Sequence, residues 1–188
     1  SNIVKLDGGV GSDTLDFGQH SASTVALTLT IGGATNFENL KGTPGAETIT
    51  GDANDNALAG WGGLDTIYGL AGDDHLSAYI DSSSEPSGCG TSANATDTSN
   101  DKLYGGAGDD TYVVDSTSDT VTEGSSAGTD LIQSSVTYTA SNNVENLTLT
   151  GSSNIDATGN SLDNTLTGNS GNNTLNGGSG DDTLIGGA

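Results

Sequence analysis

The chain has 188 residues and a formal net charge of −22, with 25 acidic residues against three lysines and no arginine. This sign of charge excludes nucleic acid as a partner, and no apolar run approaches the length of a membrane span, so we expect no membrane insertion. With 30 glycines and only 4% aromatic residues, the chain has little material for an ordinary core. Self-repulsion should keep it disordered unless something neutralises the charge.

The first 41 residues combine a glycine-rich turn with segments that resemble strands. Gly8 begins the nine-residue unit GGVGSDTLD, which places Asp13 at the sixth position. Residues 17–41 leave this pattern, and residues 25–31 alternate apolar with small or polar residues, as a half-buried strand does. Because the chain begins and ends within the pattern, we expect it to be a segment of a longer protein.

Residues 42–77 consist of four nine-residue units laid end to end: GTPGAETIT, GDANDNALA, GWGGLDTIY and GLAGDDHLS. Each opens with glycine, has an acid or amide at its sixth position, and has Ile or Leu at its eighth. A period of nine fits neither a helical face nor simple strand alternation. It predicts a turn of about six residues followed by a very short strand with one inward apolar residue. The eighth-position residues are Ile49, Leu58, Ile67 and Leu76.

Residues 78–100 form an insertion rich in Ser, Thr, Asn and Gly that contains Pro86 and Cys89. We expect a surface loop on one side of the repeats, which either contacts a partner or is a tolerated excursion. Cys89 is the only cysteine, so no disulfide can form within the chain. This thiol either pairs between molecules or stays free.

The nine-residue units return in residues 101–188. Two extra residues near Glu123 disturb the spacing before Asp130, and the last block has Asn164 and Asn173 where the pattern has Asp. Residues 143–147 (NVENL) correspond to residues 36–40 (NFENL), which indicates two copies of a larger unit with longer-strand spacers. We therefore predict a first block at 1–77, an insertion at 78–100 and a second block at 101–188, stacked as one continuous solenoid.

The pattern has a physical reason. Glycine allows positive φ, so a tight turn can aim several carbonyls at one point. Calcium takes 6–8 oxygens at roughly 2.3–2.6 Å, more than one turn supplies. If successive units lie on opposite sides of a flattened coil, turns on the same side are eighteen residues apart, which places Glu47 over Asp65 and Asn164 near Asp182. A flexible linker would not need the regular apolar eighth position.

The best-formed units begin at Gly8, Gly105 and Gly177 and match Gly-Gly-x-Gly-x-Asp-x-apolar-x. The chain therefore resembles the repeats-in-toxin (RTX, hemolysin-type calcium-binding) family. This resemblance implies an all-β, right-handed parallel β-roll, a solenoid with several Ca²⁺ ions held between successive turns.

The predicted calcium ligands are the sixth-position side chains and, in three turns, backbone carbonyls. Amide oxygens bring no charge, so the Asn positions should bind weakly or stay empty. The side chains are those of Asp13, Glu47, Asn56, Asp65, Asp74, Asp101, Asp110, Asp119, Asp130, Asn164, Asn173 and Asp182; the carbonyls are those of Gly60, Gly62, Gly105, Ala107, Gly177 and Ser179.

The favoured function is a non-catalytic structural or adhesive module of an exported bacterial protein, such as a cell-surface adhesin or surface-layer protein. The resemblance implies type I secretion and folding on calcium outside the cell. His20 and His75 are isolated, with no zinc spacing and no Ser-His-Asp pattern, so we expect no active site. The alternative is the accessory β-roll of a secreted protease, lipase or polysaccharide epimerase. Self-association and a cell-surface glycan or protein partner both remain open.

Overall fold

The computed structural model describes residues 10, 13–17, 26–28, 38–78 and 99–187. Within these residues the chain forms seventeen short strands and no helix, and therefore no helix that could cross a membrane. In chain order the strands are β1 (Thr14–Asp16), β2 (Ala26–Thr28), β3 (Asn39–Lys41), β4 (Thr48–Thr50), β5 (Ala57–Ala59), β6 (Thr66–Ala71), β7 (His75–Ser77), β8 (Lys102–Ala107), β9 (Thr111–Val114), β10 (Thr120–Thr122), β11 (Leu131–Ser134), β12 (Tyr138–Thr139), β13 (Asn146–Leu149), β14 (Ala157–Thr158), β15 (Thr165–Thr167), β16 (Leu175–Asn176) and β17 (Thr183–Ile185).

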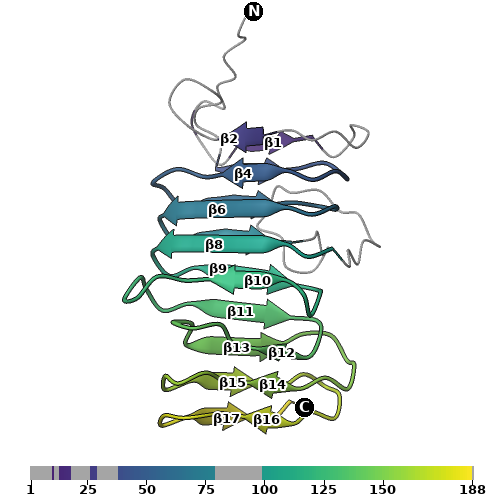
Figure 1. The fold of residues 1–188 in the computed structure, drawn as a ribbon, viewed down its shortest axis with the longest axis vertical. Coiled ribbons are helices and arrows are strands. Elements are labelled where there is room, and N and C mark those ends of the chain that lie inside the picture. Colours follow the sequence, from purple (N-terminus) through teal and green to yellow (C-terminus); the bar gives the residue numbers. More distant parts are fainter. Residues whose placement is uncertain (1–9, 11–12, 18–25, 29–37, 79–98, 188) are drawn as a thin grey trace, which may run out of the picture.

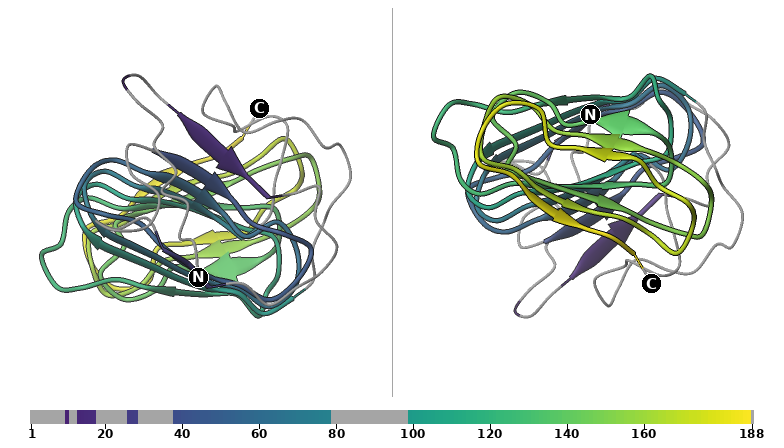
Figure 2. Two further views of the ribbon diagram at one scale, coloured as in Figure 1. Left: turned by 90° about the horizontal axis from the view of Figure 1, so that it is seen from above. Right: turned by 90° about the horizontal axis from the view of Figure 1, so that it is seen from below.

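Successive strands alternate between two faces of a stacked coil (Figure 1). The odd-numbered strands, β1 to β17, form one nine-stranded sheet. On the other face, β2 to β10 form a five-stranded sheet, and β12, β14 and β16 form a three-stranded one. Neighbouring strands are parallel. Viewed along the stack, the two faces enclose a flat interior (Figure 2). The predicted all-β parallel solenoid is confirmed.

The interior is built from the eighth positions of the repeats. In the nine-stranded sheet Leu58 aligns with Leu76, and Leu76 aligns with Tyr112. On the other face Ile67 aligns with Leu103. All of these side chains are at most 1% exposed. Because each short strand contributes one inward residue to a continuous ladder, the core exists only when coils stack.

The strands on either side of residues 79–98 are direct neighbours. β6 pairs with β8, and β7 pairs with β9. The stack therefore continues across the insertion, while Pro86 and Cys89 lie outside the described residues.

The second spacer differs from the repeats in its turns rather than through longer strands. Its strands β11, β12 and β13 have two to four residues, whereas β6 and β8 have six. Between β10 and β12 the even-numbered face changes from one sheet to the next. The Tyr138 hydroxyl spans this seam and donates a hydrogen bond to the Asp119 carbonyl over 2.9 Å.

Candidate metal-binding turns

Most of the sixth-position side chains stack in two columns, one before the strands of the nine-stranded sheet and one before those of the five-stranded sheet. In the first column, which precedes the odd-numbered strands, each Oδ1 accepts a hydrogen bond from the backbone N–H of the sixth residue one coil earlier. The donor–acceptor pairs are Asn56–Asp74 (2.8 Å), Asp74–Asp110 (2.8 Å), Asp110–Asp130 (2.9 Å) and Asn164–Asp182 (2.9 Å). The expected stacking of same-side turns is confirmed.

The second column precedes the strands of the five-stranded sheet and has the same geometry. Its pairs are Glu47–Asp65 (2.7 Å), Asp65–Asp101 (2.6 Å) and Asp101–Asp119 (3.0 Å). The twelve side chains predicted as calcium ligands therefore do not converge on a single site. They are distributed along the stack, so that each turn faces the next.

Three carboxylates of the first column are buried with only one oxygen hydrogen-bonded. Asp74, Asp110 and Asp130 are at most 2% exposed, and their Oδ2 atoms accept no hydrogen bond. Burial raises the pKa of Asp74 and Asp130 to about 7 and that of Asp110 to about 6. A buried charge without a partner is costly. These oxygens fit a hard dication, which would neutralise them.

The first glycine of each unit makes room for this carboxylate. A Cβ at Gly105 would collide with Asp110 Oδ2 and the Tyr112 hydroxyl, and one at Gly177 would collide with Asp182 Oδ2. Gly106 and Gly108 have φ values of 118° and 134°, a region that L side chains rarely adopt. The Gly-Gly-x-Gly pattern therefore shapes a turn whose backbone lies against the acid.

The predicted carbonyl ligands lie in these same turns. The Ala107 carbonyl accepts a hydrogen bond from the Gly72 N–H at 2.9 Å, and Gly60 lies against Gly42 of the preceding coil. Gly62 is half-buried, and Ser179 is exposed. Whether these carbonyls bind calcium stays a prediction.

Two predicted ligands have both carboxylate oxygens hydrogen-bonded, at least one of them by the residue's own turn. Asp119 Oδ2 accepts hydrogen bonds from the N–H groups of Asp115 (3.2 Å) and Ser116 (3.0 Å). Glu47 accepts hydrogen bonds from the N–H (3.0 Å) and the hydroxyl (2.5 Å) of Thr43. The protein already supplies donors here, so these turns depend less on a cation than the turns of Asp74 and Asp110.

The asparagine turns use their amide hydrogens to join the coils. Asn164 Nδ2 donates to the carbonyls of Val144 (3.0 Å) and Glu145 (3.2 Å) in the preceding coil. Asn173 Nδ2 donates to the Ile155 carbonyl at 2.6 Å. In these turns the amide N–H groups of the asparagines hydrogen-bond the backbone carbonyl oxygens of the neighbouring coil. Those carbonyls need no cation, which is a physical reason for the expected weak calcium binding.

Two glutamates also belong to the first column and were not predicted as ligands. The Asp13 N–H donates to Glu38 Oε2, and the Asp130 N–H donates to Glu145 Oε2, both over 2.8 Å. The signal was present in the sequence: Glu-Asn-Leu in the two spacers places an acid two residues before the buried leucine, as Asp-x-Leu does in the repeats. Glu123, which we treated only as a disturbance of the spacing, is also buried.

The comparisons agree with this geometry. The RTX calcium-binding nonapeptide repeat (4 copies) matches residues 41–76, 95–121 and 158–188, together half of the chain. No curated protein matches the sequence. Repeats of this family bind Ca²⁺, and the buried oxygens of Asp74, Asp110 and Asp130 are suited to that ion. The chain therefore belongs to the RTX calcium-binding nonapeptide repeat family and is a calcium-binding β-roll module.

Proposed function

We propose that this module is a non-catalytic structural or adhesive part of an exported bacterial protein, which folds when it meets calcium outside the cell. The observation that supports this most directly is the first column of stacked acids, with its buried, unpaired Oδ2 atoms. RTX repeats are typical of secreted bacterial proteins, which supports an extracellular or cell-surface location.

The charge distribution favours one coupled event of folding and metal binding. A chain of net charge −22 that also buries carboxylates is destabilised by self-repulsion when calcium is scarce. Each bound dication removes part of that repulsion and adds its binding free energy to folding. Extracellular calcium modules have dissociation constants on the order of 10⁻⁴–10⁻³ M, so such a chain would fold after export.

The described surface does not favour a roll that grips an anionic polysaccharide. Lys41 is 4% exposed, lies 4.7 Å from the ring centre of Trp61 and pairs with Asp16 at 3.9 Å. Among the described lysines this leaves only Lys102 exposed. An accessory role beside an epimerase that acts on such a polymer is therefore the less supported candidate, while a role beside a secreted protease or lipase is the alternative that this observation does not address.

Limited proteolysis of the purified chain tests the coupling that export requires. We expect rapid cleavage throughout the chain at submicromolar calcium and resistance at millimolar calcium. Magnesium at the same concentration serves as the control for general screening of charge. Equal resistance at both calcium concentrations would contradict the proposal.

A further inference from the structure

Glu123 stands in an unusual place in the coil. It follows β10 directly, at the position where a regular repeat has its first glycine. The next strand, β11, begins eight residues later at Leu131. Glu123 lies outside the segments that match the repeat family. Its side chain nevertheless points inward and is only 7% exposed. The buried position of this acid requires a physical explanation.

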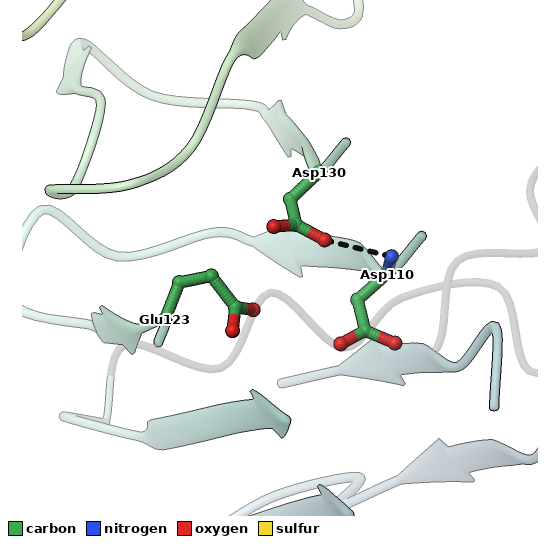
Figure 3. Close-up of side chains that lie close together, drawn as sticks. All are labelled: Asp110, Glu123 and Asp130. Carbon is green, nitrogen blue, oxygen red and sulfur yellow. Dashed lines mark hydrogen bonds between the residues drawn. The ribbon is translucent and has the colours of Figure 1, made fainter. Parts of the chain in front are cut away.

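Three buried carboxylates meet at this point. Oxygen atoms of Asp110, Glu123 and Asp130 all lie within 4.8 Å of one another, and Figure 3 shows the Glu123 carboxylate directed towards that of Asp110. Asp110 and Asp130 come from consecutive coils of the first column, whereas Glu123 reaches in from the end of β10. The ion pair found among the described residues, Lys41–Asp16, lies elsewhere.

The hydrogen bonds of this cluster leave oxygens unsatisfied. Glu123 accepts hydrogen bonds from the Gly124 N–H at 2.7 Å and from the Tyr112 hydroxyl. Asp110 and Asp130 each accept one backbone N–H through Oδ1. Their Oδ2 atoms are buried and accept none, so two carboxylate oxygens of the cluster have no hydrogen-bond donor.

Tyr112 adds a fourth oxygen. It aligns with Leu76 and Ile132 in the neighbouring strands, so its ring belongs to the aliphatic ladder of the core. A Cβ placed on Gly105 would touch both the Tyr112 hydroxyl and Asp110 Oδ2. The hydroxyl and the carboxylate therefore converge on the same small region.

Among the three acids, Glu123 is the one that lines a cavity at the seam between the sheets. Glu123 lines a cavity of about 500 Å³ together with Val121, Thr122 and residues 140–143, at the seam between β10 and β12. Glu123 therefore borders both this cavity and the carboxylates of Asp110 and Asp130.

We propose that Asp110, Glu123 and Asp130 bind a divalent cation in a site whose composition differs from that of the regular turns, because a glutamate side chain replaces the first glycine. The location of the site does not depend on the proposed function. The inference rests on that function only in taking the bound ion to be calcium. Three carboxylates give this site more negative charge than a pair of stacked turns supplies. Ligand charge raises calcium affinity, so this site should be the tightest in the chain.

Calcium titration against a chromophoric chelator tests the affinity. The wild-type chain should show one ion bound about tenfold more tightly than the rest, and Glu123→Gln should lose that step while still folding at saturating calcium. Asp181→Asn, which removes one exposed charge, should retain it. Retention of the tight step in a folded Glu123→Gln chain would overturn this inference alone. A wild-type chain that takes up no calcium would overturn the proposed function as well.

Terbium luminescence gives a second test that does not depend on the folding of the Gln variant. Tb³⁺ replaces calcium at oxygen sites and is sensitised by a tyrosine in close proximity. The first equivalent should give tyrosine-sensitised emission in the wild-type chain, and Tyr112→Phe should lose most of it. Undiminished emission in Tyr112→Phe would place the tight ion elsewhere and overturn the inference.

Discussion

The backbone N–H of Asp74 donates a hydrogen bond to Asp110 Oδ1 over 2.8 Å, although 36 residues separate them. The pair Asn56 and Asp74 makes the same contact at the same distance across 18 residues. The position of a residue within its turn, rather than its distance along the chain, therefore decides its partner. This regularity brings acids of neighbouring coils close enough for a cation to hold them together.

Replacing one buried acid of the column should weaken calcium-dependent folding. Asp74→Asn keeps an acceptor for the Asn56 N–H but removes the charge of a side chain that is 2% exposed. We expect the calcium midpoint of folding to rise by about tenfold. Asp73→Asn removes the same charge from an exposed position in the same turn and should change the midpoint little. Equal shifts in the two variants would contradict a ligand role for Asp74.

The metal-free chain should become more stable as the pH falls from about 7 to about 4. Burial raises the pKa of Asp74, Asp110 and Asp130 from 3.8 to about 7, 6 and 7. The folded state then binds protons more tightly than the unfolded chain, so the free energy of unfolding rises as the pH falls through these values. Far-UV circular dichroism of the calcium-free chain between pH 7 and pH 4 measures this trend as a gain of β-structure. Less β-structure at pH 5 than at pH 7 would contradict it.

Converting an amide turn into an acidic one should make it depend on metal. Asn164→Asp loses the N–H groups that contact Val144 and Glu145 and places a charge against their carbonyls. At the lowest calcium concentration that keeps the wild-type chain folded, we expect a loss of about 1–3 kcal/mol in the free energy of unfolding. Asn172→Asp, at an exposed position, is the matched control. The account of the amide turns fails if both variants unfold at the same urea concentration.

A methyl group on the first glycine of a repeat should disrupt its turn. In Gly105→Ala the new Cβ would collide with Asp110 Oδ2 and the Tyr112 hydroxyl, whereas nothing lies within 4 Å of a Cβ at Gly186. Overpacking of this kind costs about 1–3 kcal/mol. Thermal unfolding with saturating calcium should therefore show a lower midpoint for Gly105→Ala than for Gly186→Ala. The reverse order would be inconsistent with the turn geometry.

The repeating part of the fold could be predicted because its signal is local and periodic. An apolar eighth position places Ile67 and Leu103 in the core, and a sixth-position acid places Asp65 beside Asp101. Each unit needs only an apolar eighth position and an acid or amide at its sixth position. A wrong prediction for one turn therefore leaves the predictions for the other turns unchanged. Even the 23-residue insertion expected at 78–100 does not disturb the pairing of β6 with β8.

The contacts that depend on the irregular coils could not be predicted in this way. Glu123 accepts a hydrogen bond from the Tyr112 hydroxyl because the turn after β10 departs from the nine-residue repeat. The repeat pattern therefore does not predict this contact. The carbonyls that Asn164 satisfies belong to the second spacer, whose path the repeats do not fix. Glu38 and Glu145 lie in the spacers, outside the nine-residue period that locates the other acids of the column.

Far-UV circular dichroism during calcium titration of the intact chain, starting in EDTA, tests the central claim most directly. The account predicts a cooperative transition from coil to β-structure between micromolar and millimolar calcium, because stacked acids cannot stay buried without a cation. A complete β spectrum already present in EDTA at neutral pH would show that the strands and core suffice without metal. That result would contradict calcium-coupled folding.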